Sequence, residues 1–486
     1  MARGPLQFRW RTRPGVTIAP DGAEALAITV DGETSARLRP GAALAAALAR
    51  FGAADGVGEE EIVAAAGGDA AAVARAHYAL RRFVGNGLLV CDVLDGGAAG
   101  GAPLATVLPR RRDFALEGGA SAPGAGGPPT QARLSRFALL RRDGDALLLA
   151  CPGAGCELLL HDERAAGWFA AAAFAPVAVE REPSRADADA AARSDTGDDD
   201  AAARTALLRL ALAHGLLEAA EAQESPAEAS WEFHDRLFHH AARSFDDLVV
   251  RGGTFRFDGT LPSPPAIRPP HAGAEHALPA VEEDASSQPL REVMERRRSR
   301  REMSEQPLPL RSLAAVLWRV ARTTAHDRTG PQETIRRPYP SGGSLHELEL
   351  YVAVGRCEGL EPGFYHYRGD AHALTQLPGA AAPAAAMLDG AARAWGQEGA
   401  PPQVLVVLAS RLPRLAWKYS GIAYKVSLLN AGVAIQSLSL VTTDLGLAGA
   451  AVGSGDPGLF AQATGCDPFE ETSIAEFGFG AAAGAT

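Results

Sequence analysis

Residues 417–446, WKYSGIAYKVSLLNAGVAIQSLSLVTTDLG, decide the fold of the C-terminal part of the chain. From Ile422 onward, apolar residues face almost every side of a helix, and a helix without a polar face is buried in a core or against a partner. Gly446 is a stop signal for a helix. We therefore predict a buried helix over residues 422–445, around which the C-terminal domain packs. Its Ser, Asn, Gln and Thr residues, with Lys425 among them, predict that it does not span a membrane.

The composition limits the classes of function. The chain of 486 residues has a formal net charge of −11, which argues against general binding to nucleic acid or to anionic membranes. The first residues, MARGPLQFRWRTRPG, are positively charged without a following apolar segment, so we expect no signal peptide. The cysteines are odd in number and scattered, which predicts reduced thiols in a cytoplasmic protein and no metal site: Cys91, Cys151, Cys156, Cys357 and Cys466.

Residues 1–95 are predicted to form one small α/β unit. Its expected elements are strands over 16–18 and 25–30, helices over 41–51, 59–66 and 69–86, and a returning strand over 87–90. This order predicts a winged-helix-like unit. The basic helix needed for DNA is only faintly present, so a sheet edge that accepts a peptide or protein is favoured. A scaffold without a ligand stays an open alternative.

A second winged-helix-like unit is predicted over residues 133–246, after a Gly/Ala/Pro-rich linker over 96–132. It comprises a hairpin over 137–151, helices over 162–172 and 202–213, and an acidic insertion, 180–201, expected to be disordered. The stretch SWEFHDRLFHHAARS, 230–244, brings three histidines near Asp235, but adjacent histidines point to different faces of a helix. We expect these rings to pack against the catalytic domain. Residues 247–288 are a Pro-rich strap.

Residues 289–486 are predicted to form the last domain. Helices are expected over 290–301, 308–321 and 457–463, a strand or helix end over 347–354, an antiparallel pair over 363–367 and 373–377, and buried strands over 402–409 and 447–452. A Gly-rich tail is expected to close the chain.

Three short motifs in this domain have side chains suited to chemistry. A basic run with a hydroxyl suits a phosphate and a polyol, a small-residue turn lets backbone approach a flat ligand, and a cation beside a phenol can move a proton. Each also has a simpler explanation, as a solvated face, an ordinary turn or a helix-entry cation beside an interface tyrosine. The motifs are Arg297, Arg298, Ser299 and Arg301; Ser341, Gly342 and Gly343; and Lys418 and Tyr419. Neither a GxGxxG fingerprint nor a P-loop accompanies them.

In this order and spacing, the motifs resemble the SagB/ThcOx-type FMN-dependent dehydrogenases of the nitroreductase superfamily. The matching stretches are RRRSRREM, LAAVLW, PSGGSLHELELYV, GLEPGFYHY, WKYSGIAYKVSLLNAGVAIQSLSL and LGLAGAAVGSG, within residues 291–480. The N-terminal half resembles the family more loosely, through winged-helix-like peptide-recognition units and the WEFHDRLFHHAARS connector.

The resemblance implies an α+β fold: a nitroreductase-like α/β sandwich, with FMN at the interface of a swapped homodimer. Arg297, Arg298 and Ser299 would hold the phosphate and ribityl chain, and Arg301 the polar edge of the ring. The flavin would be lined by Ser341, Gly342 and Gly343 and approached by Gly453, Ser454 and Gly455. Lys418 and Tyr419 match the family's catalytic pair. Val433 and His346 depart from the family pattern, which affects substrate contacts rather than the flavin.

The implied reaction is the oxidation of thiazoline or oxazoline rings in a ribosomally made peptide to thiazole or oxazole. The base would be Tyr419 as a phenolate, with its pKa lowered by Lys418, or Lys418 as the neutral amine. The implied partners are the precursor peptide and a cyclodehydratase complex. Two rival functions stay open, an NAD(P)H-dependent nitro or quinone reductase and a non-catalytic peptide-binding scaffold.

Overall fold

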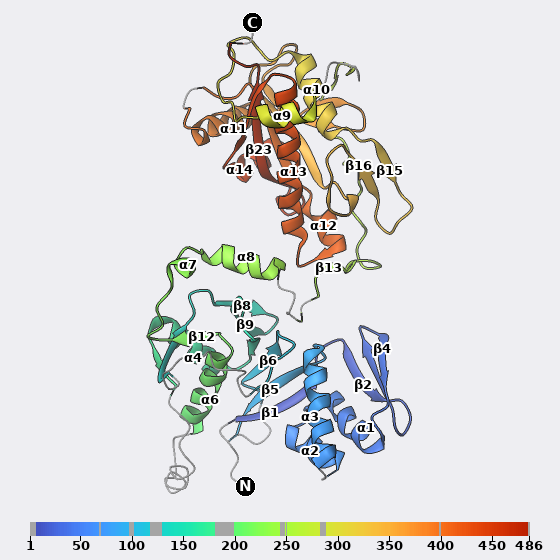
Figure 1. Ribbon diagram of the computed structural model, residues 1–486, viewed down its shortest axis with the longest axis vertical. Coiled ribbons are helices and arrows are strands. Elements are labelled where there is room, and N and C mark those ends of the chain that lie inside the picture. Colours follow the sequence, from blue (N-terminus) through green and yellow to red (C-terminus); the bar gives the residue numbers. More distant parts are fainter. Residues whose placement is uncertain are drawn as a thin grey trace. The chain divides into compact units, whose positions relative to one another are not determined.

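The computed structural model describes residues 6–67, 70–96, 102–116, 129–179, 199–243, 248, 250–281, 288–397 and 400–484. The chain divides into two compact units, Met1–Val249 and Val250–Thr486, both drawn in Figure 1. Most of the acidic insertion predicted to be disordered, residues 180–198, lies outside the described residues, as do parts of the predicted linker and strap.

The N-terminal unit is a mixed arrangement of strands and helices. Its strands are β1 (Leu6–Thr12), β2 (Val16–Pro20), β3 (Leu26–Val30), β4 (Glu33–Leu38), β5 (Leu89–Asp95), β6 (Ala105–Pro109), β7 (Gln131–Leu134), β8 (Leu139–Asp143), β9 (Ala146–Ala150), β10 (Cys156–Leu160), β11 (Val177–Ala178) and β12 (Leu217–Ala219). Its helices are α1 (Ala42–Ala49), α2 (Glu59–Ala66), α3 (Ala70–Gly85), α4 (Glu163–Phe174), α6 (Asp199–Ala213), α7 (Pro226–Ala229) and α8 (Phe233–Arg243). The predicted helices and the hairpin of residues 137–151 are confirmed, whereas the winged-helix description stays a prediction.

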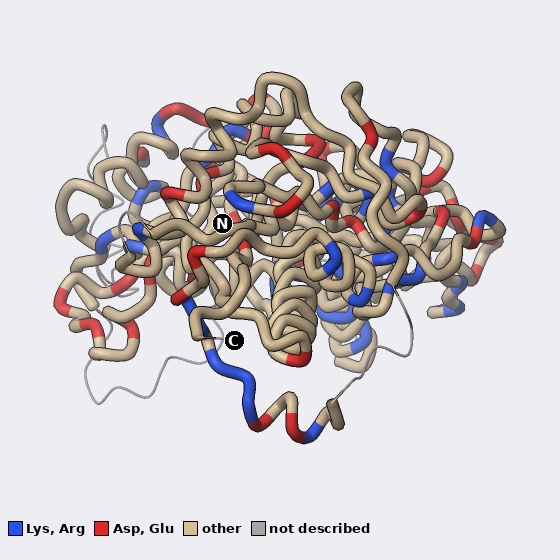
Figure 2. The backbone as a smooth tube through the Cα atoms, turned by 90° about the horizontal axis from the view of Figure 1, so that it is seen from above, with Lys and Arg blue, Asp and Glu red and all other residues tan. Residues whose placement is uncertain are grey.

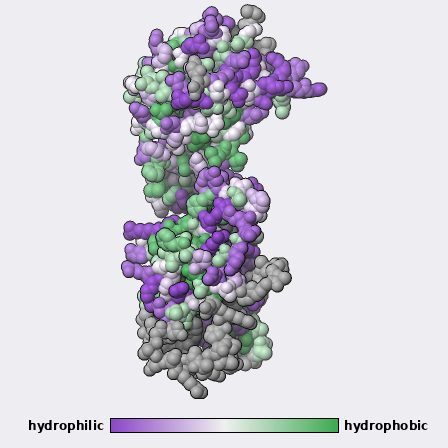
Figure 3. Space-filling model, turned by 90° about the vertical axis from the view of Figure 1, so that its left-hand side faces the viewer, coloured by the Kyte–Doolittle hydropathy of each residue, from purple (hydrophilic) through white to green (hydrophobic). Residues whose placement is uncertain are grey.

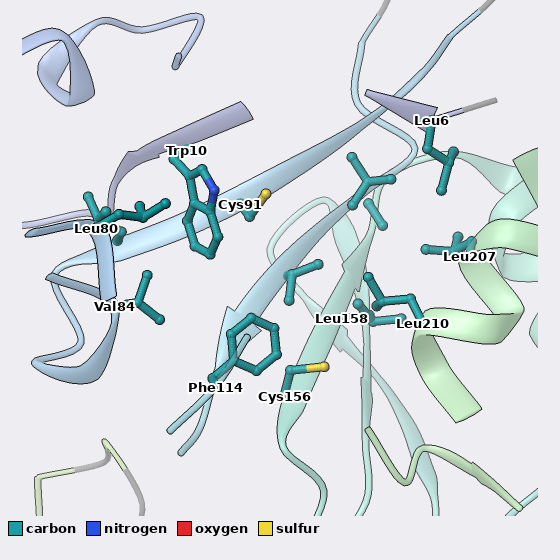
Figure 4. Close-up of a cluster of buried hydrophobic side chains, with 14 of the residues drawn as sticks. Leu6, Trp10, Leu80, Val84, Cys91, Phe114, Cys156, Leu158, Leu207 and Leu210 are labelled. Atoms are coloured by element: carbon teal, nitrogen blue, oxygen red, sulfur yellow. The ribbon is translucent and has the colours of Figure 1, made fainter. Parts of the chain in front are cut away.

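One six-stranded sheet, in the order β1-β5-β6-β10-β9-β8, runs through this unit. Strand β6 pairs with β5 on one side and with β10 on the other, so it joins the two predicted units into one sheet. The expectation of a linker over residues 96–132 is therefore wrong for Ala105–Pro109. A single apolar core covers the sheet and includes Trp10, Cys91, Leu158 and Leu207 (Figure 4). A short apolar strand between Gly-rich segments was read as linker because its neighbours dominate the local composition.

Helix α8 carries the histidine-rich stretch. The ring of His239 packs edge-on against Trp231, with centroids 5.3 Å apart, and His240 Nε2 accepts a hydrogen bond from the Gly153 N–H. These imidazoles thus contact the N-terminal unit itself. Glu232, His234 and Asp235 can bring ligand atoms within 4.8 Å of one another, but all three are exposed.

The C-terminal unit is built on a wider sheet. Its strands are β13 (Gly252–Gly253), β14 (Glu275–Ala277), β15 (Ala325–Asp327), β16 (Thr334–Arg336), β17 (Leu348–Val354), β18 (Gly363–Arg368), β19 (Ala373–Gln376), β20 (Val404–Ser410), β21 (Tyr419–Ser420), β22 (Ala448–Val452) and β23 (Thr472–Gly480). Its helices are α9 (Leu290–Arg296), α10 (Leu310–Ala321), α11 (Ala381–Ala394), α12 (Leu412–Lys418), α13 (Ala423–Asp444) and α14 (Pro457–Thr464), with a 3₁₀ turn at Gly342–Ser344.

The seven-stranded sheet has the order β14-β19-β18-β17-β20-β23-β22. Helices α10 and α13 cover one face and α11 and α14 cover the other, because alternate residues of β17 enter two different cores. Strand β14 shows that the predicted strap belongs to this unit. The expected Gly-rich tail instead contains β23, an internal strand between β20 and the edge strand β22, whose glycines admit Trp395 and Gln403 against the backbone. This close approach explains why glycine-rich sequence forms a buried strand here.

Helix α13 confirms the predicted helix but not its burial on all sides. The buried face is made of small and polar residues, Ser427, Asn430, Ala431, Ala434, Leu438 and Thr442. Its apolar residues Tyr424, Leu428, Leu429 and Val433 are exposed, with Leu429 at 59%. Green apolar patches also occur elsewhere on the surface of both units (Figure 3).

By length and composition alone, α13 is the one helix among the described residues that could cross a membrane, and the expectation that it does not do so stays a prediction. Four of its hydroxyls bond back to helix carbonyls, as Thr442 does to Leu438, which reduces their effective polarity. One such helix is weak evidence of a span, because the core helix of a soluble protein passes the same test.

Candidate functional site

Lys418 and Tyr419 lie at the corner between α12 and α13. Lys418 is the last residue of α12, and Tyr419 forms the short strand β21, which pairs with β13 through Gly253. Trp417 is buried and donates its indole N–H to the Leu261 carbonyl at 2.9 Å. The corner is therefore held by backbone pairing and by a buried anchor immediately before the two side chains. The sequence did not predict α12, since only its last two residues were read as part of the motif.

The Ser341–Gly343 turn lies directly against this pair. A Cβ atom on Gly343 would lie 2.6 Å from Tyr419 Oη and 2.8 Å from Lys418 Nζ, and Gly343 has a φ of 64°. The positive φ favours glycine at this position, and an added Cβ would displace the ends of both side chains. The structure thus brings together two of the three predicted motifs, which stand 75 residues apart in the sequence.

A buried polar network supports the turn from behind. Asn430 of α13 accepts a hydrogen bond from the Gly342 N–H at 3.1 Å and donates to Ser341 Oγ at 3.0 Å. The same amide donates to Glu347 Oε2 at 2.9 Å, and Ser427 donates to Glu347 Oε1 at 3.0 Å. Burial raises the pKa of Glu347, which has no exposed surface, and the hydrogen bonds from Ser427 and Asn430 partly oppose that rise. The Glu347 carboxyl therefore holds the Asn430 amide in place, and this amide binds the backbone of the turn at Gly342.

Sequence reasoning missed this network. Glu347 and Asn430 lie 83 residues apart, so no local pattern connects them. Two features of the sequence were available as signals. Glu347 and Glu349 lie at the start of an otherwise apolar strand, and Asn430 lies inside an apolar helix. Buried polar groups require partners, and that requirement alone could have indicated that these segments meet.

The Lys418 ammonium lies between two aromatic rings. Its Nζ is 5.5 Å from the centroid of Phe255 and 5.4 Å from that of Tyr419, distances typical of cation–π contacts. Phe255 has a φ of 51°, which is rare outside glycine, and its N–H donates to the Lys418 carbonyl at 3.1 Å. Burial raises the pKa of Tyr419. Burial therefore opposes the phenolate that one of the two assignments expects, and the choice of base between Tyr419 and Lys418 stays a prediction.

A second buried polar cluster lies around Glu349. Burial acts to raise the pKa of Glu349, but the hydrogen bond from His366 and the charges of Arg337 and Arg411 outweigh it and hold the pKa at about 2. His366 Nε2 lies 3.2 Å from Glu349 Oε2, and Arg411 Nη1 lies 3.2 Å from Oε1. Near the turn, burial and the charges of Arg337 and Arg414 lower the pKa of His346 to about 3, so its imidazole is neutral.

The basic motif is placed elsewhere in the unit. Helix α9 ends at Arg296, so the run after it is extended rather than helical, as the blue stretch following a short helix in Figure 2 shows. Arg298, Ser299 and Arg301 are exposed and Arg297 is half-buried. Among the described residues, none of these arginines has a carboxylate partner within 4.0 Å. Arg298 Nη1 does donate to the carbonyls of Glu295 and Arg297. Guanidinium groups without a carboxylate partner, beside a hydroxyl, are a donor set suited to a phosphate.

The basic motif and the Ser341–Gly343 turn lie beside different parts of α13: the motif near its C-terminal end, and the turn near Asn430. The Arg300 N–H bonds to the Gly449 carbonyl, and the Gln288 N–H bonds to Asp444, the last residue of α13. The turn bonds instead to Asn430. At 1.5 Å of rise per residue, Asn430 and Asp444 are about 21 Å apart along the axis. One chain therefore does not bring the basic motif to the Lys418 corner.

Gly453, Ser454 and Gly455 form an exposed loop between β22 and α14. Gly455 lies tightly against the carboxyl of Glu476 in β23, where an added Cβ would be 2.5 Å from Oε1. Burial, and then the nearby Asp456, raise the pKa of Glu476 to about 7. The sequence did not indicate Glu476, because it was assigned to the tail.

Comparisons with known proteins agree with the division of the chain into an N-terminal and a C-terminal unit. Residues 132–246 match the cyanobactin oxidase ThcOx family, and residues 294–480 match the nitroreductase family. A nitroreductase-like protein of Methanocaldococcus jannaschii is 28% identical over 37% of this chain and 84% of its own length. The trifolitoxin-processing protein TfxB of Rhizobium leguminosarum bv. trifolii is 36% identical over 12% of this chain, a match that spans only 16% of that relative.

Solved structures give weaker likenesses. A nitroreductase-type crystal structure from Ralstonia eutropha has a TM-score of 0.35 at 22% identity, over 48% of this chain and 99% of the other. The E. coli microcin synthetase complex with a truncated pro-peptide bound has a TM-score of 0.33 at 18% identity, over 43% of this chain and 76% of the other.

The two matched families cover the second half of the N-terminal unit and nearly all of the sheet that carries Lys418 and the Ser341–Gly343 turn. Both are families of oxidoreductases by name. The chain is therefore an oxidoreductase of the nitroreductase superfamily, of the SagB/ThcOx type.

Proposed function

We propose that the protein oxidises thiazoline or oxazoline rings of a ribosomally made peptide to thiazole or oxazole, with FMN as cofactor. The observation that carries this proposal is the contact between the Ser341–Gly343 turn and the Lys418–Tyr419 pair. A rigid glycine surface beside a proton-transferring pair suits a flat cofactor facing a ring that loses a proton. The match to an oxidase family over residues 132–246 supports an oxidase rather than a reductase.

The residues present fit FMN. The exposed Arg298, Ser299 and Arg301 offer charge and hydroxyl donors without a carboxylate competitor among the described residues. They would hold the phosphate and ribityl chain, with Arg297 beside them. The turn of Ser341, Gly342 and Gly343 would line the ring, and the loop of Gly453 to Gly455 would approach it.

The separation along α13 supports a cofactor site that is built from two copies of the chain. If one copy supplies the basic motif, the partner supplies the turn and the Lys418 corner. The exposed apolar residues of α13, Leu428, Leu429 and Val433, offer the surface on which such a homodimer would form. On α9, Leu290 and Met294 extend it, at 63% and 57% exposed.

Aromatising the ring removes two electrons and two protons. FMN, when bound, would accept a hydride from the ring, and molecular oxygen would return the reduced flavin to its oxidised form. The chain must take the remaining proton from the ring carbon. We assign proton removal to Lys418 Nζ as the neutral amine, because burial raises the pKa of Tyr419 and so disfavours its phenolate. Tyr419 then donates a hydrogen bond that orients the substrate. The rings of Phe255 and Tyr419 hold the Lys418 side chain in place.

The first test is the visible spectrum of the purified protein, with the released chromophore identified by mass. We expect flavin bands, FMN on denaturation, and oxygen-dependent conversion of an azoline peptide to the azole. Rapid NADPH oxidation by a nitroaromatic, without azoline conversion, would instead indicate a reductase. A colourless protein that takes up no added FMN would contradict the proposed oxidation and favour the alternative of a non-catalytic peptide-binding scaffold.

The catalytic pair is tested by Lys418→Met and Tyr419→Phe. General base catalysis contributes about 10²–10⁴-fold, so Lys418→Met should lower turnover by about 100-fold or more while FMN content is unchanged. Tyr419→Phe should cost less, about 10-fold, because it removes one hydrogen bond. Parental turnover in Lys418→Met with full flavin content would overturn the assignment.

The precursor peptide is expected to dock on the N-terminal unit. Strand β1 is an edge of the six-stranded sheet, and a groove of about 790 Å³ runs beside it, lined by β1, α3 and the start of α2. Among the described residues, the one bridge on the outer side of β1 is Trp10 with Val57. An edge strand beside a groove can accept an extended peptide. The match to a trifolitoxin-processing protein supports a peptide partner, and a cyclodehydratase complex would deliver its azolines.

A matched pair of charge substitutions tests this groove. Phe8→Glu places a carboxylate in the groove, and we expect peptide affinity to fall about 10-fold with flavin content unchanged. Leu140→Glu, on the opposite edge strand β8, places the same charge at a residue 40% exposed and should leave affinity unchanged. Equal effects of the two variants would contradict the assignment of the groove.

A further inference from the structure

We propose that a pocket between α11, α14 and β23 binds an alkylammonium group, such as the side chain of a lysine. The pocket has a volume of about 240 Å³ and lies on the sheet face opposite α13. It is lined by Met387, Arg393, Gly455, Leu459 and Glu476 together with smaller residues. The pocket includes Ser454 and Gly455 of the loop proposed to approach the flavin, but neither Lys418 nor the basic motif contributes to it.

The carboxyl of Glu476 lines the pocket without a partner. Glu476 is only 4% exposed, yet among the described residues no donor lies within hydrogen-bond distance of its oxygens. Strand β23 fixes its position, because Glu476 stands opposite Val452 in the register with β22. Gly455 lets the loop close over the carboxyl, since any side chain there would collide with Oε1. The carboxyl faces the pocket and lies largely out of solvent, so a cation in the pocket would meet an acceptor that no donor of the described residues satisfies.

The shape and charge of the pocket select the kind of cation. Its walls include Ala386, Met387, Ala394 and Leu459, which suit a chain of methylene groups. The remaining charged groups that line it are Asp456, which adds to the negative potential, and the exposed Arg393. A compact ammonium can pair with one buried carboxylate, whereas a guanidinium needs a fork of acceptors to satisfy its donors. An apolar stem ending in an ammonium is therefore the ligand class that fits.

Binding should compete with protons at Glu476. Burial and the neighbouring Asp456 raise the pKa of Glu476 to about 7, so the carboxyl becomes neutral as the pH falls through that value. At pH 6 about a tenth of the carboxyl groups are ionised, so affinity should be roughly 10-fold lower than at pH 8. The ligand in turn should lower the pKa of Glu476, because it stabilises the ionised form.

The test uses the full chain and calorimetry with Nα-acetyl-lysine amide. We expect binding at pH 8, a loss of about 10-fold at pH 6, and no binding in Glu476→Gln. The matched control Glu470→Gln, which changes an exposed acid in the same unit, should bind as the parent does. Parental binding by Glu476→Gln, or equal binding of the uncharged Nα-acetyl-norleucine amide, would overturn the proposal.

Further probes identify the source of the group. Propylamine that binds as tightly as Nα-acetyl-lysine amide would indicate a free amine, and weaker propylamine would indicate a lysine of a peptide; both support the alkylammonium class. Tighter binding of propylguanidine would overturn it. Should Glu476→Gln fail to fold, carboxyl ¹³C NMR of the parent protein decides: a pKa of Glu476 that saturating Nα-acetyl-lysine amide does not lower contradicts the proposal.

Discussion

The two units of the chain bury different kinds of residue. The core of the N-terminal unit is largely apolar, and its buried acid Asp92 pairs with Arg11 and Thr106 near one edge of the sheet. The C-terminal unit buries many ionisable side chains around its sheet, namely His346, Glu347, Glu349, His366, Arg411, Arg414, Glu471 and Glu476. Buried charges need specific partners, so they fix geometry where an apolar core fixes only shape. The difference accords with the two proposals, which place the chemistry in the C-terminal unit and peptide docking on the sheet of the N-terminal unit.

The largest effect is expected from removing the carboxyl beneath the Ser341–Gly343 turn. In Glu347→Leu, the donors of Asn430 and Ser427 lose their acceptor, which should destabilise the C-terminal unit by about 3 kcal/mol and release the flavin. Hydrogen exchange resolved by unit measures this effect.

Asp92→Asn is the counterpart in the N-terminal unit. This substitution should weaken the protection of backbone amides against hydrogen exchange around β5 and β6, while the flavin content stays unchanged. If Glu347→Leu kept both its flavin and its protection, the network would not support the turn, and the contrast between the units would lose its basis.

The next effect concerns the apolar face of α13. If the proposed homodimer forms on this face, Leu429→Glu should convert it to a monomer and abolish flavin binding, because each proposed cofactor site would lose one of its two halves. The matched change Tyr78→Glu, at a residue 66% exposed on α3 of the N-terminal unit, should alter neither the oligomeric state nor the flavin content. Light scattering and the flavin spectrum provide the two measurements. A dimeric Leu429→Glu protein with full flavin would show that α13 does not form the interface.

A smaller effect is expected from pH. Glu349 has its pKa held at about 2 in the folded chain, below its ordinary value of 4.5, so its contribution to stability is present above pH 4.5 and is lost as the pH falls toward 2. The C-terminal unit should therefore lose exchange protection over this range. Glu349→Gln should flatten that dependence. An unchanged pH profile in this variant would show that other carboxyls control the acid transition.

Local patterns predicted most elements of both units. The helix over residues 422–445, the pair of strands β18 and β19 and the hairpin of β8 and β9 followed from hydrophobic periodicity and turn residues, which act over a few positions. Strands β6 and β23 were missed, because glycine and proline around them suggested linkers, and pairing with distant strands overrode that local signal.

The sequence by itself therefore determined most of the elements, the motifs and the family, because each of these depends on neighbouring residues. Only the tertiary structure decided which face of α13 is buried, and it placed Asn430 inward and Leu429 outward, against simple hydropathy. It also brought Glu347 beneath a turn that Asn430 holds, and it separated Arg297 to Arg301 from Lys418. The physical reason is that a buried polar group is stable only beside its partner, and these partners come from segments far apart in the chain.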